Sequence, residues 1–363
     1  MLRLSHRGTV VAASVYKRHM SLGTFPTIDV ASFLSGKGGQ KECQLVAQEL
    51  RENGILVIKD PRVTMTDNDV FIDTMEKYFD QDEAVISKDI RKQYHYQVGM
   101  TPPHIEQARD HSDVVKTYSR ENKALTHSPP PLDPKSRFFW RMGKTPPQTA
   151  WKELHAEQVV PTTIPNWSNI MNRWGSLMLQ SVHTAAEMAA LGMGLKKETF
   201  TSMMEFGPHL LAPTGSNLSK WSQRDTVFAN FHYDFNFMTI HGRSRFPGLY
   251  IWTRKGQKLP AKVPEGCLLI QAGKQLEWLT AGEVIAGFHE VVVDDNTLAA
   301  IDRAKKAGKS LTRVSSTLFA HVGSDELLRP LGHFAKLPSA SKYPSTAAGQ
   351  QVQDELAAIN LAS

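Results

Sequence analysis

The stretch NFHYDFNF, residues 230–237, places His232 and Asp234 two positions apart inside a run of aromatic and apolar residues. Such a run predicts a buried strand, and on a strand residues i and i+2 point to the same face. The imidazole and the carboxylate would then project together, while Tyr233 points away. One interpretation is a polar pair that satisfies itself within a core. The other is that one strand supplies two ligands of a metal site.

The third ligand of such a site is predicted at His289, in the later β-prone stretch VIAGFHEVVV. Its neighbours are hydrophobic, and an imidazole without a partner would be poorly stabilised among them. Two histidines and one carboxylate on one side of a metal ion leave its other positions open, which suits non-heme Fe(II) and oxygen chemistry. We expect no catalytic residue beyond these metal ligands.

A second pair of polar residues follows in the stretch RVSS, where Arg313 and Ser315 again stand at i and i+2 of a predicted strand. The guanidinium can bind both oxygens of a carboxylate, and the hydroxyl can donate a third hydrogen bond. The alternative is a surface arginine beside an ordinary strand serine. The order H-x-D, then His, then R-x-S, all on strands, is more specific than any of its parts.

The elements that would position these residues change in kind along the chain. Helical periodicity and stop signals predict a strand and turn at 25–34, a helix at 41–54 ending at Gly54, a strand at 55–60, a helix at 66–80 with Thr66 as N-cap, and a long helix at 165–194. The Pro-rich segment 126–149 is expected to be an ordered surface excursion that buries its aromatic residues. From TSMMEFG (201–207) onward, short β-prone runs separated by Gly, Pro and Asn indicate a sandwich or jelly roll.

Composition excludes several classes of protein. The chain of 363 residues is 41% hydrophobic and 21% charged, as in a soluble globular protein. No apolar run approaches the roughly 18–20 residues of a membrane helix. The formal net charge is +6, but four basic residues and no acid fall within residues 1–28, namely Arg3, Arg7, Lys17 and Arg18. The rest of the chain is nearly neutral, which argues against a nucleic-acid partner.

Residues 1–24 form a basic, acid-free leader. Its composition suits either a mitochondrial transit peptide or a disordered arm that is not a targeting signal, so the expected location is mitochondrial or cytoplasmic. The two cysteines, Cys43 and Cys267, show no metal-binding spacing. They are expected to be buried hydrophobes in a reducing compartment.

Several further stretches carry a family resemblance. FPTIDVASFL, VAQELRENGILVIKD, GLYIW and GCLLIQAGKQLEWLTAGEVIAGFHEVVV, together with the H-x-D, His and R-x-S residues, resemble the isopenicillin N synthase-like family of Fe(II)/2-oxoglutarate-dependent oxygenases over about residues 25–335. The resemblance implies an α+β fold with a mostly β core, a distorted double-stranded β-helix (jelly roll) flanked by helices. The implied organisation is a leader at 1–24, a helical and strand region at 25–200, a jelly-roll catalytic core at 201–335 and a C-terminal tail at 336–363.

The resemblance also implies a function and its cofactors. His232, Asp234 and His289 would bind Fe(II), while Arg313 and Ser315 would hold the distal carboxylate of the co-substrate 2-oxoglutarate. With O2, the enzyme would hydroxylate, desaturate or cyclise a small-molecule substrate. The expected protein is a monomer that binds neither nucleic acid nor membranes.

The sequence departs from the family pattern in three places. Phe206 takes the expected position of a tyrosine that helps to hold 2-oxoglutarate, and it has no hydroxyl. Residues 294–312 are an inserted helix, either a lid or a surface hairpin. The loop arginines Arg243 and Arg245 are possible substrate contacts or simply solvated, and Arg141 has the same ambiguity.

Two alternatives to the dioxygenase remain open on this sequence. An Fe(II)-dependent oxidase of the same family would keep the iron without using 2-oxoglutarate, and the missing tyrosine hydroxyl makes this conceivable. A non-catalytic binding protein would keep only the fold, although it would have no need to retain all five polar residues.

Overall fold

The computed structural model describes residues 25–361, so the predicted leader at 1–24 lies outside the described residues. The helices are α1 (Ala31–Leu34), α2 (Gln40–Asn53), α3 (Met65–Phe79), α4 (Glu83–Ile86), α5 (Ser112–Lys116), α6 (Trp167–Gly192), α7 (Thr199–Met203), α8 (Lys274–Leu279), α9 (Asp295–Lys306) and α10 (Ala348–Ala358). The strands are β1 (Thr27–Asp29), β2 (Ile55–Lys59), β3 (Gly99–Thr101), β4 (Ser136–Met142), β5 (His209–Leu211), β6 (Thr214–Asn217), β7 (Val227–Tyr233), β8 (Met238–His241), β9 (Leu249–Trp252), β10 (Lys258–Pro260), β11 (Leu268–Ala272), β12 (Phe288–Val292), β13 (Thr312–Ser315), β14 (Thr317–Ala320), β15 (Leu327–Leu328) and β16 (Thr346–Ala347).

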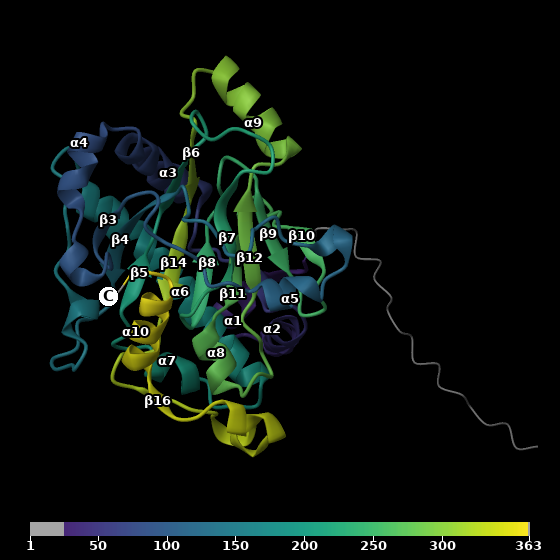
Figure 1. The fold of residues 1–363 in the computed structure, drawn as a ribbon. Coiled ribbons are helices and arrows are strands. Elements are labelled where there is room, and N and C mark those ends of the chain that lie inside the picture. The colour runs from purple at the N-terminus through teal and green to yellow at the C-terminus, as the bar shows by residue number, and fades with distance from the viewer. Residues whose placement is uncertain (1–24, 362–363) are drawn as a thin grey trace, which may run out of the picture.

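Most strands belong to two sheets (Figure 1). The ten-stranded sheet has the order β1-β2-β11-β8-β14-β5-β4-β6-β13, with β3 paired to β4, and the four-stranded sheet has the order β10-β9-β12-β7. β15 and β16 form a separate two-stranded ladder. The predicted α+β class with a mostly β core is confirmed. Strands from residues 25–200 share the large sheet with strands that follow residue 200.

The register of the large sheet gives it one apolar face and one partly polar face. Partnered residues on neighbouring antiparallel strands point to the same side. One such row is wholly apolar and fully or almost fully buried: Ile270, Ile240, Leu318, Leu211 and Trp140. The adjacent row on the other face is Gln271, Thr239, Phe319, Leu210 and Arg141, and next to it Leu269, His241 and Thr317 are partnered. The apolar row joins the main core with α2, α3 and α6.

Helix α6 is the long helix predicted at 165–194, and its buried side packs in the main core. Trp174 on this side donates its indole N–H to Ser316 Oγ at 2.7 Å. At its end α6 crosses α2 closely, because a Cβ at Gly192 would lie 2.0 Å from the carbonyl oxygen of Cys43. Glycine is therefore required at this crossing. Helix α2 ends as predicted at Gly54, which has a left-handed conformation with φ of 68°.

Three local predictions are corrected by the structure. The N-cap of α3 is Thr64 and not Thr66, because Thr64 and Asp67 form a reciprocal capping box. The stretch 201–207 was expected to be β-prone, but it contains most of α7 and the turn after it. The segment 126–149 is more than a surface excursion, because β4 runs through it and lies inside the large sheet, where its apolar residues are buried.

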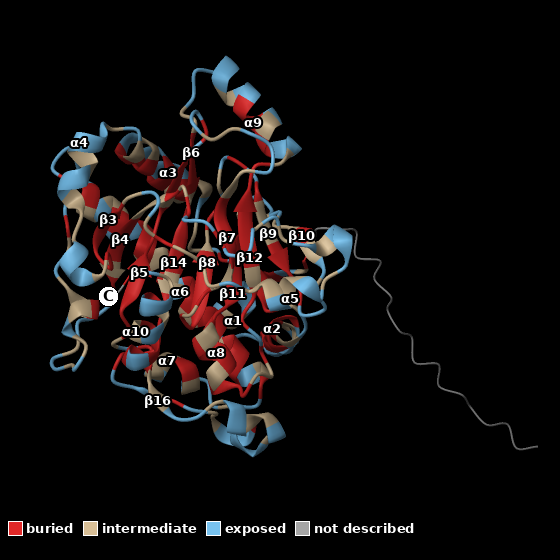
Figure 2. Ribbon diagram, viewed as in Figure 1, coloured by how far each residue is buried: buried red, intermediate tan, exposed pale blue. Residues whose placement is uncertain are grey.

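The inserted helix predicted within residues 294–312 is present as α9. It begins at the N-cap Asp294, whose carboxylate accepts the backbone N–H of Thr297 at 2.7 Å. Its buried residue Ile301 packs with Phe228 in a small core of its own. Figure 1 shows α9 at the upper edge of the molecule, and Figure 2 shows that much of its surface is exposed. This position is that of a surface element.

The C-terminal segment packs against the body of the protein. Val352 and Leu356 of α10 are buried together with Tyr96 and Leu154, which come from two earlier segments. Figure 2 shows buried residues along the central strands and exposed residues at the rim. Among residues 25–361, no helix combines the length and the apolar character that crossing a membrane requires.

Replacing Gly192 with alanine should lower the free energy of unfolding by about 2 kcal/mol or more, because the added methyl group forces α6 and α2 apart. Denaturant unfolding followed by circular dichroism measures the change. Leu191→Ala is the matched control: Leu191 is 43% exposed, so its truncation should change the free energy by less than about 0.5 kcal/mol. Equal stability of Gly192→Ala and wild type would contradict the close crossing.

Candidate metal centre

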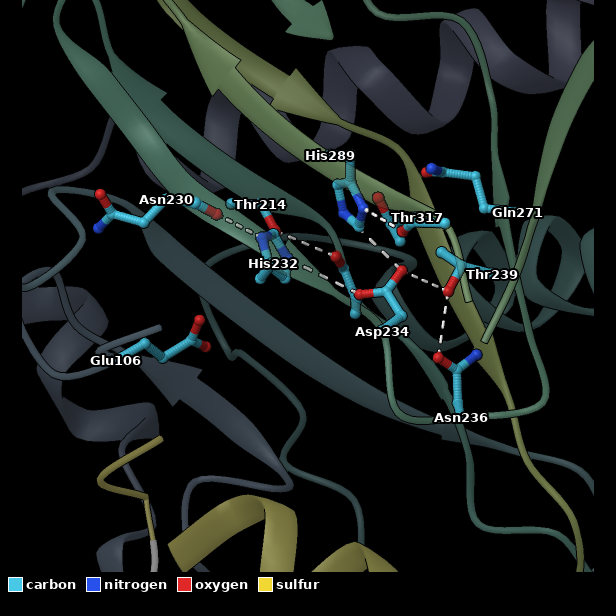
Figure 3. Close-up of polar contacts among 12 residues, drawn as sticks. Glu106, Thr214, Asn230, His232, Asp234, Asn236, Thr239, Gln271, His289 and Thr317 are labelled. Carbon is cyan, nitrogen blue, oxygen red and sulfur yellow. Dashed lines mark hydrogen bonds and ion pairs between the residues drawn. The ribbon is translucent and has the colours of Figure 1, made fainter. Parts of the chain in front are cut away.

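The structure brings His232, Asp234 and His289 together. One nitrogen of each imidazole and one carboxylate oxygen all lie within 4.8 Å of one another. His232 is in β7 and His289 in β12, and the two residues are direct partners in the antiparallel ladder. Asp234 lies one residue beyond the end of β7, so the predicted pair is at the C-terminal end of the strand and not in its middle. Figure 3 shows the three side chains pointing toward one another.

Hydrogen bonds orient both imidazoles. Nδ1 of His232 lies 2.5 Å from the carbonyl oxygen of Asn230, and Nδ1 of His289 lies 3.4 Å from that of Gly287. A carbonyl can only accept, so each Nδ1 carries the proton and each Nε2 keeps a free lone pair. Both Nε2 atoms lie 3.8 Å from an oxygen of Asp234. The two lone pairs and the carboxylate thus converge on one point.

The charge state of the cluster suits a cation. Burial by itself raises the pKa of Asp234, but the neighbouring His289 and His232 and a 2.6 Å hydrogen bond from Thr239 outweigh it and leave the pKa below its ordinary value. Burial and the proximity of His289 lower the pKa of His232 well below its ordinary value. At neutral pH the site therefore offers an ionised carboxylate and a neutral His232 imidazole, which are the forms that bind metal ions.

Asn230 connects this cluster to charges farther from it. The Asp133 carboxylate accepts the backbone N–H of Asn230 at 3.0 Å and also its side-chain amide. This fixes the carbonyl that holds His232, in the way that outer hydrogen bonds orient the ligands of metal sites. Two imidazoles and one carboxylate on one side are the donor set of non-heme iron sites with open positions, so the residues present fit such an ion.

Arg313 and Ser315 are also brought together, as the sequence predicts. Arg313 is buried, donates its Nη1–H to Ser315 Oγ at 2.5 Å and its Nε–H to the Pro247 carbonyl at 3.0 Å. Burial lowers the pKa of Arg313 to about 10, so it remains charged at neutral pH. The pair lies at one end of the Arg313 cavity, whose lining includes His241, Leu249 and Leu269.

His241 extends this cavity toward the metal ligands. Its ring centroid lies 6.4 Å from that of His289. Its two nitrogens lie 3.1 Å from Thr317 Oγ1 and 3.1 Å from Gln271 Oε1. Burial lowers the pKa of His241 to about 4, so the imidazole is neutral and places no charge between the histidines and Arg313.

The structure corrects the position assigned to Phe206. The strand that pairs with β13 is β6, where Ser216 lies opposite Arg313 and Thr214 opposite Ser315. Phe206 lies earlier, in the turn between α7 and β5. The side chains next to Arg313 therefore carry hydroxyl groups.

The candidate substrate arginines Arg243 and Arg245 line the Arg313 cavity, whereas Arg141 lines neither this cavity nor the one that contains His232 and Asp234. Arg245 is held by Asp73 and Glu76, each at 2.6 Å, so its guanidinium is already paired. Arg243 is half-exposed and lies 3.8 Å from Glu265. Arg141 donates weakly to the Ala156 carbonyl at 3.4 Å.

A second cavity lies on the other side of His232 and Asp234; we call it the Arg137 cavity. The two cavities measure about 770 Å³ for the Arg137 cavity and 880 Å³ for the Arg313 cavity. The Arg137 cavity is lined by two of the three metal-ligand candidates, His232 and Asp234, and by Glu106, Arg137, Phe139, Phe319, His321 and residues of the C-terminal segment. Figure 3 shows Glu106 and Gln271 on opposite sides of the ligands.

The lining of the Arg137 cavity was missed in the sequence. The signal is in DPKSR, where Asp133, Lys135 and Arg137 alternate at i, i+2 and i+4 of an extended run. This alternation is the pattern of a strand with one charged face, but the prolines around it favoured a loop. The C-terminal contribution, from Glu355 to Leu361, has no comparable signal because only the fold brings it here.

Comparison with known proteins agrees with this geometry. No protein-family model matches the chain. The 2-oxoglutarate-Fe(II) type oxidoreductase ppzC of Metarhizium majus (strain ARSEF 297) is 23% identical over 281 residues, which cover 73% of this chain and 72% of ppzC. A 2OG-Fe(II) oxygenase family protein from Caulobacter crescentus has a TM-score of 0.72 at 21% identity, over 92% of this chain and 99% of that one. A full-length Neurospora crassa protein, in complex with alpha-KG and thymine, has a TM-score of 0.72 at 17% identity, over 93% and 98%.

The chain has the 2OG-Fe(II) oxygenase fold. The resemblance found in the sequence is thereby confirmed at the level of the fold. His232 and Asp234 line the Arg137 cavity, and His241, whose ring lies 6.4 Å from that of His289, lines the Arg313 cavity.

Thr239→Val should weaken metal binding by this protein roughly tenfold to a hundredfold, because Asp234 loses the hydroxyl that orients it. Titration of the metal-free protein with Co(II), followed by its visible absorption, measures the affinity. Thr239→Ser should restore it. Thr317→Val removes a hydroxyl that contacts His241 instead, and it should leave Co(II) affinity unchanged. Wild-type affinity in Thr239→Val would show that the hydroxyl does not orient the carboxylate.

Proposed function

We propose that this chain is an Fe(II)/2-oxoglutarate-dependent dioxygenase that hydroxylates, desaturates or cyclises a small molecule. The observation that carries the proposal is the convergence of the three candidate ligands, with one cavity lined by His232 and Asp234 and a second cavity lined by the buried guanidinium–hydroxyl pair of Arg313 and Ser315. The names of ppzC and of the Neurospora crassa complex, which mention 2-oxoglutarate with Fe(II) and alpha-KG, support the same pair of cofactors.

In this proposal His232 and His289 bind Fe(II) through Nε2, and Asp234 binds it through its carboxylate. Arg313 and Ser315 bind the distal carboxylate of 2-oxoglutarate. The bound iron supplies the redox chemistry by which O2 and 2-oxoglutarate are converted with loss of CO2 to succinate, while the substrate is oxidised.

The chain's own residues orient these partners and exclude water. The Pro247 carbonyl fixes Nε of Arg313, so the guanidinium keeps one direction. Leu249 and Leu269 line the same cavity and provide apolar walls around the charged end. In such a low-dielectric surrounding, an ion pair between Arg313 and a carboxylate is stronger than in water.

We further propose that the two sheets together form the distorted double-stranded β-helix, and that residues 201–335 are its catalytic part. Two contacts between the sheets support this. His241 of the large sheet lies beside His289 of the small sheet, and Thr239 of the large sheet donates a hydrogen bond to Asp234, which follows β7. Residues 25–200 would complete the large sheet, and residues 336–361 would close the Arg137 cavity.

The Fe(II) oxidase that dispenses with 2-oxoglutarate is not favoured. Its support was the missing hydroxyl at Phe206, and hydroxyl groups of Thr214 and Ser216 lie on the strand beside Arg313 instead. A small-molecule substrate and a monomeric protein, without nucleic acid or membrane, remain part of the proposal, in keeping with a body of nearly neutral charge.

Adding 2-oxoglutarate to the anaerobic Fe(II)-loaded protein should produce the weak visible charge-transfer absorption of the iron chelate. Arg313→Met should weaken 2-oxoglutarate binding by at least about thirtyfold, because a buried charge partner is lost. His232→Ala should abolish the absorption by removing an iron ligand. Arg243→Met changes a half-exposed arginine of the same cavity and should bind 2-oxoglutarate as wild type does.

No absorption change at saturating Fe(II) and 2-oxoglutarate would remove 2-oxoglutarate from the function. With a substrate present, one succinate per oxidised substrate supports the dioxygenase. Substrate oxidation without succinate would instead identify the oxidase.

A further inference from the structure

The walls of the Arg137 cavity indicate a substrate class, and this inference rests on the proposed function. We propose that the substrate is an uncharged small molecule with an apolar body and a carbonyl oxygen, such as an amide, a lactam or a ketone, and that Arg137 binds this oxygen.

Arg137 is held so that part of its guanidinium remains available. Its Nε donates to Thr214 Oγ1 at 3.2 Å, and its Nη1 lies 3.1 Å from Glu106 Oε1. The rings of Phe139 and Phe319 lie 5.4 and 5.5 Å from its central carbon. Among residues 25–361, Nη2 donates no hydrogen bond, and 14% of the side chain is exposed. Arg137 lines the cavity, so its guanidinium has a donor there that is not used by the described residues.

The register of the sheet explains why this donor lies near the site of reaction. Arg137 is partnered with Thr214, and Thr214 with Ser315, so the three side chains form one row across β4, β6 and β13. Arg137 belongs to the same face of the large sheet as Phe139 and Phe319, which line the cavity together with His232 and Asp234. A molecule bound to Arg137 thus lies beside the metal ligands.

The charges of the cavity wall are already paired, which decides between an acid and a neutral carbonyl compound. Glu106 lies 2.8 Å from Lys135 Nζ, and Lys135 also contacts Asp133. Arg109 lies 2.9 Å from Glu355. Arg137 is paired with Glu106 as well. Three cations are thus in contact with three carboxylates: Arg109, Lys135 and Arg137 with Glu106, Asp133 and Glu355. The remaining titratable groups besides the metal ligands are His111, His321 and Tyr233. Burial lowers the pKa of both histidines and raises the pKa of Tyr233 to about 12, so all three are uncharged at neutral pH.

A carboxylate on the substrate would add a negative charge that no cation of this wall is free to neutralise, and burying such a charge is costly. A carbonyl oxygen accepts from the guanidinium without adding charge. The remainder of the lining is largely apolar, with Leu210, Phe235, Leu356, Ile359 and Leu361 around the two phenylalanines. This lining fits an apolar body, and Nη2 of Arg137 can donate to one oxygen.

Four probes with one phenyl-alkyl skeleton test the inference: 3-phenylpropanamide, 4-phenylbutan-2-one, 3-phenylpropanoate and butylbenzene. Each is titrated into the anaerobic Fe(II)–2-oxoglutarate complex of the full chain, and the shift of the charge-transfer absorption gives its dissociation constant. The amide and the ketone should bind more tightly than the carboxylate and the hydrocarbon. Arg137→Met should weaken the amide and ketone roughly tenfold and leave butylbenzene unchanged.

The absorption of the complex before any probe is added separates the two proposals. If the wild-type protein shows no charge-transfer absorption, the proposed dioxygenase function fails. If Arg137→Met shows the full absorption, that variant is folded and its co-substrate site is intact. Thr214→Val, which removes only the hydroxyl that orients Nε, is the second variant and should weaken the amide in the same direction. The inference is overturned if the carboxylate binds most tightly, if Arg137→Met binds the amide as wild type does, or if neither carbonyl compound binds.

Discussion

The pairing of β7 with β12 is the constraint on which the rest of the site depends. It sets His232 opposite His289, and a slip by one residue would turn His289 outward and Phe288 inward. The outer face of this ladder opposes such a slip: Phe231 and Phe288 stack with centroids 4.5 Å apart. The buried Glu290 carboxylate further accepts the backbone N–H of Leu125 and is paired with Lys258. The segment that precedes β4 is thereby tied to the strand that carries a metal ligand.

The large sheet separates stability from chemistry by its two faces. Its apolar rows pack on α2, α3 and α6, where burial of large side chains provides most of the stabilisation. Its other face carries polar groups into the interior, which is tolerable because they bond to one another. Thr239 bonds to Asp234, and His241 is flanked by Thr317 and Gln271. These bonds hold a polar surface in place without requiring it to contribute to the core.

The two cavities differ in how their charge is compensated. In the Arg313 cavity the polar contacts of the buried guanidinium with the described part of the chain are a hydroxyl and a carbonyl, so a charged partner is expected there. In the Arg137 cavity the guanidinium already has Glu106 beside it. This difference is the physical basis of our proposal that a dianionic co-substrate binds in the Arg313 cavity and an uncharged substrate in the Arg137 cavity.

The sequence by itself determined the ligands, because strand periodicity places residues i and i+2 on one face: His232 with Asp234, and Arg313 with Ser315, are where this rule predicts them. It also determined α2, α6 and α9, whose periodicity and end signals are local. Only the tertiary structure decided which segments surround the site. The inclusion of β4 in the large sheet, the shift from Phe206 to β6 and the closing of the Arg137 cavity by the C-terminal segment all depend on pairing between distant residues. Such pairing leaves little trace in local sequence, since strand partners are chosen by register and packing and not by the propensity of either strand.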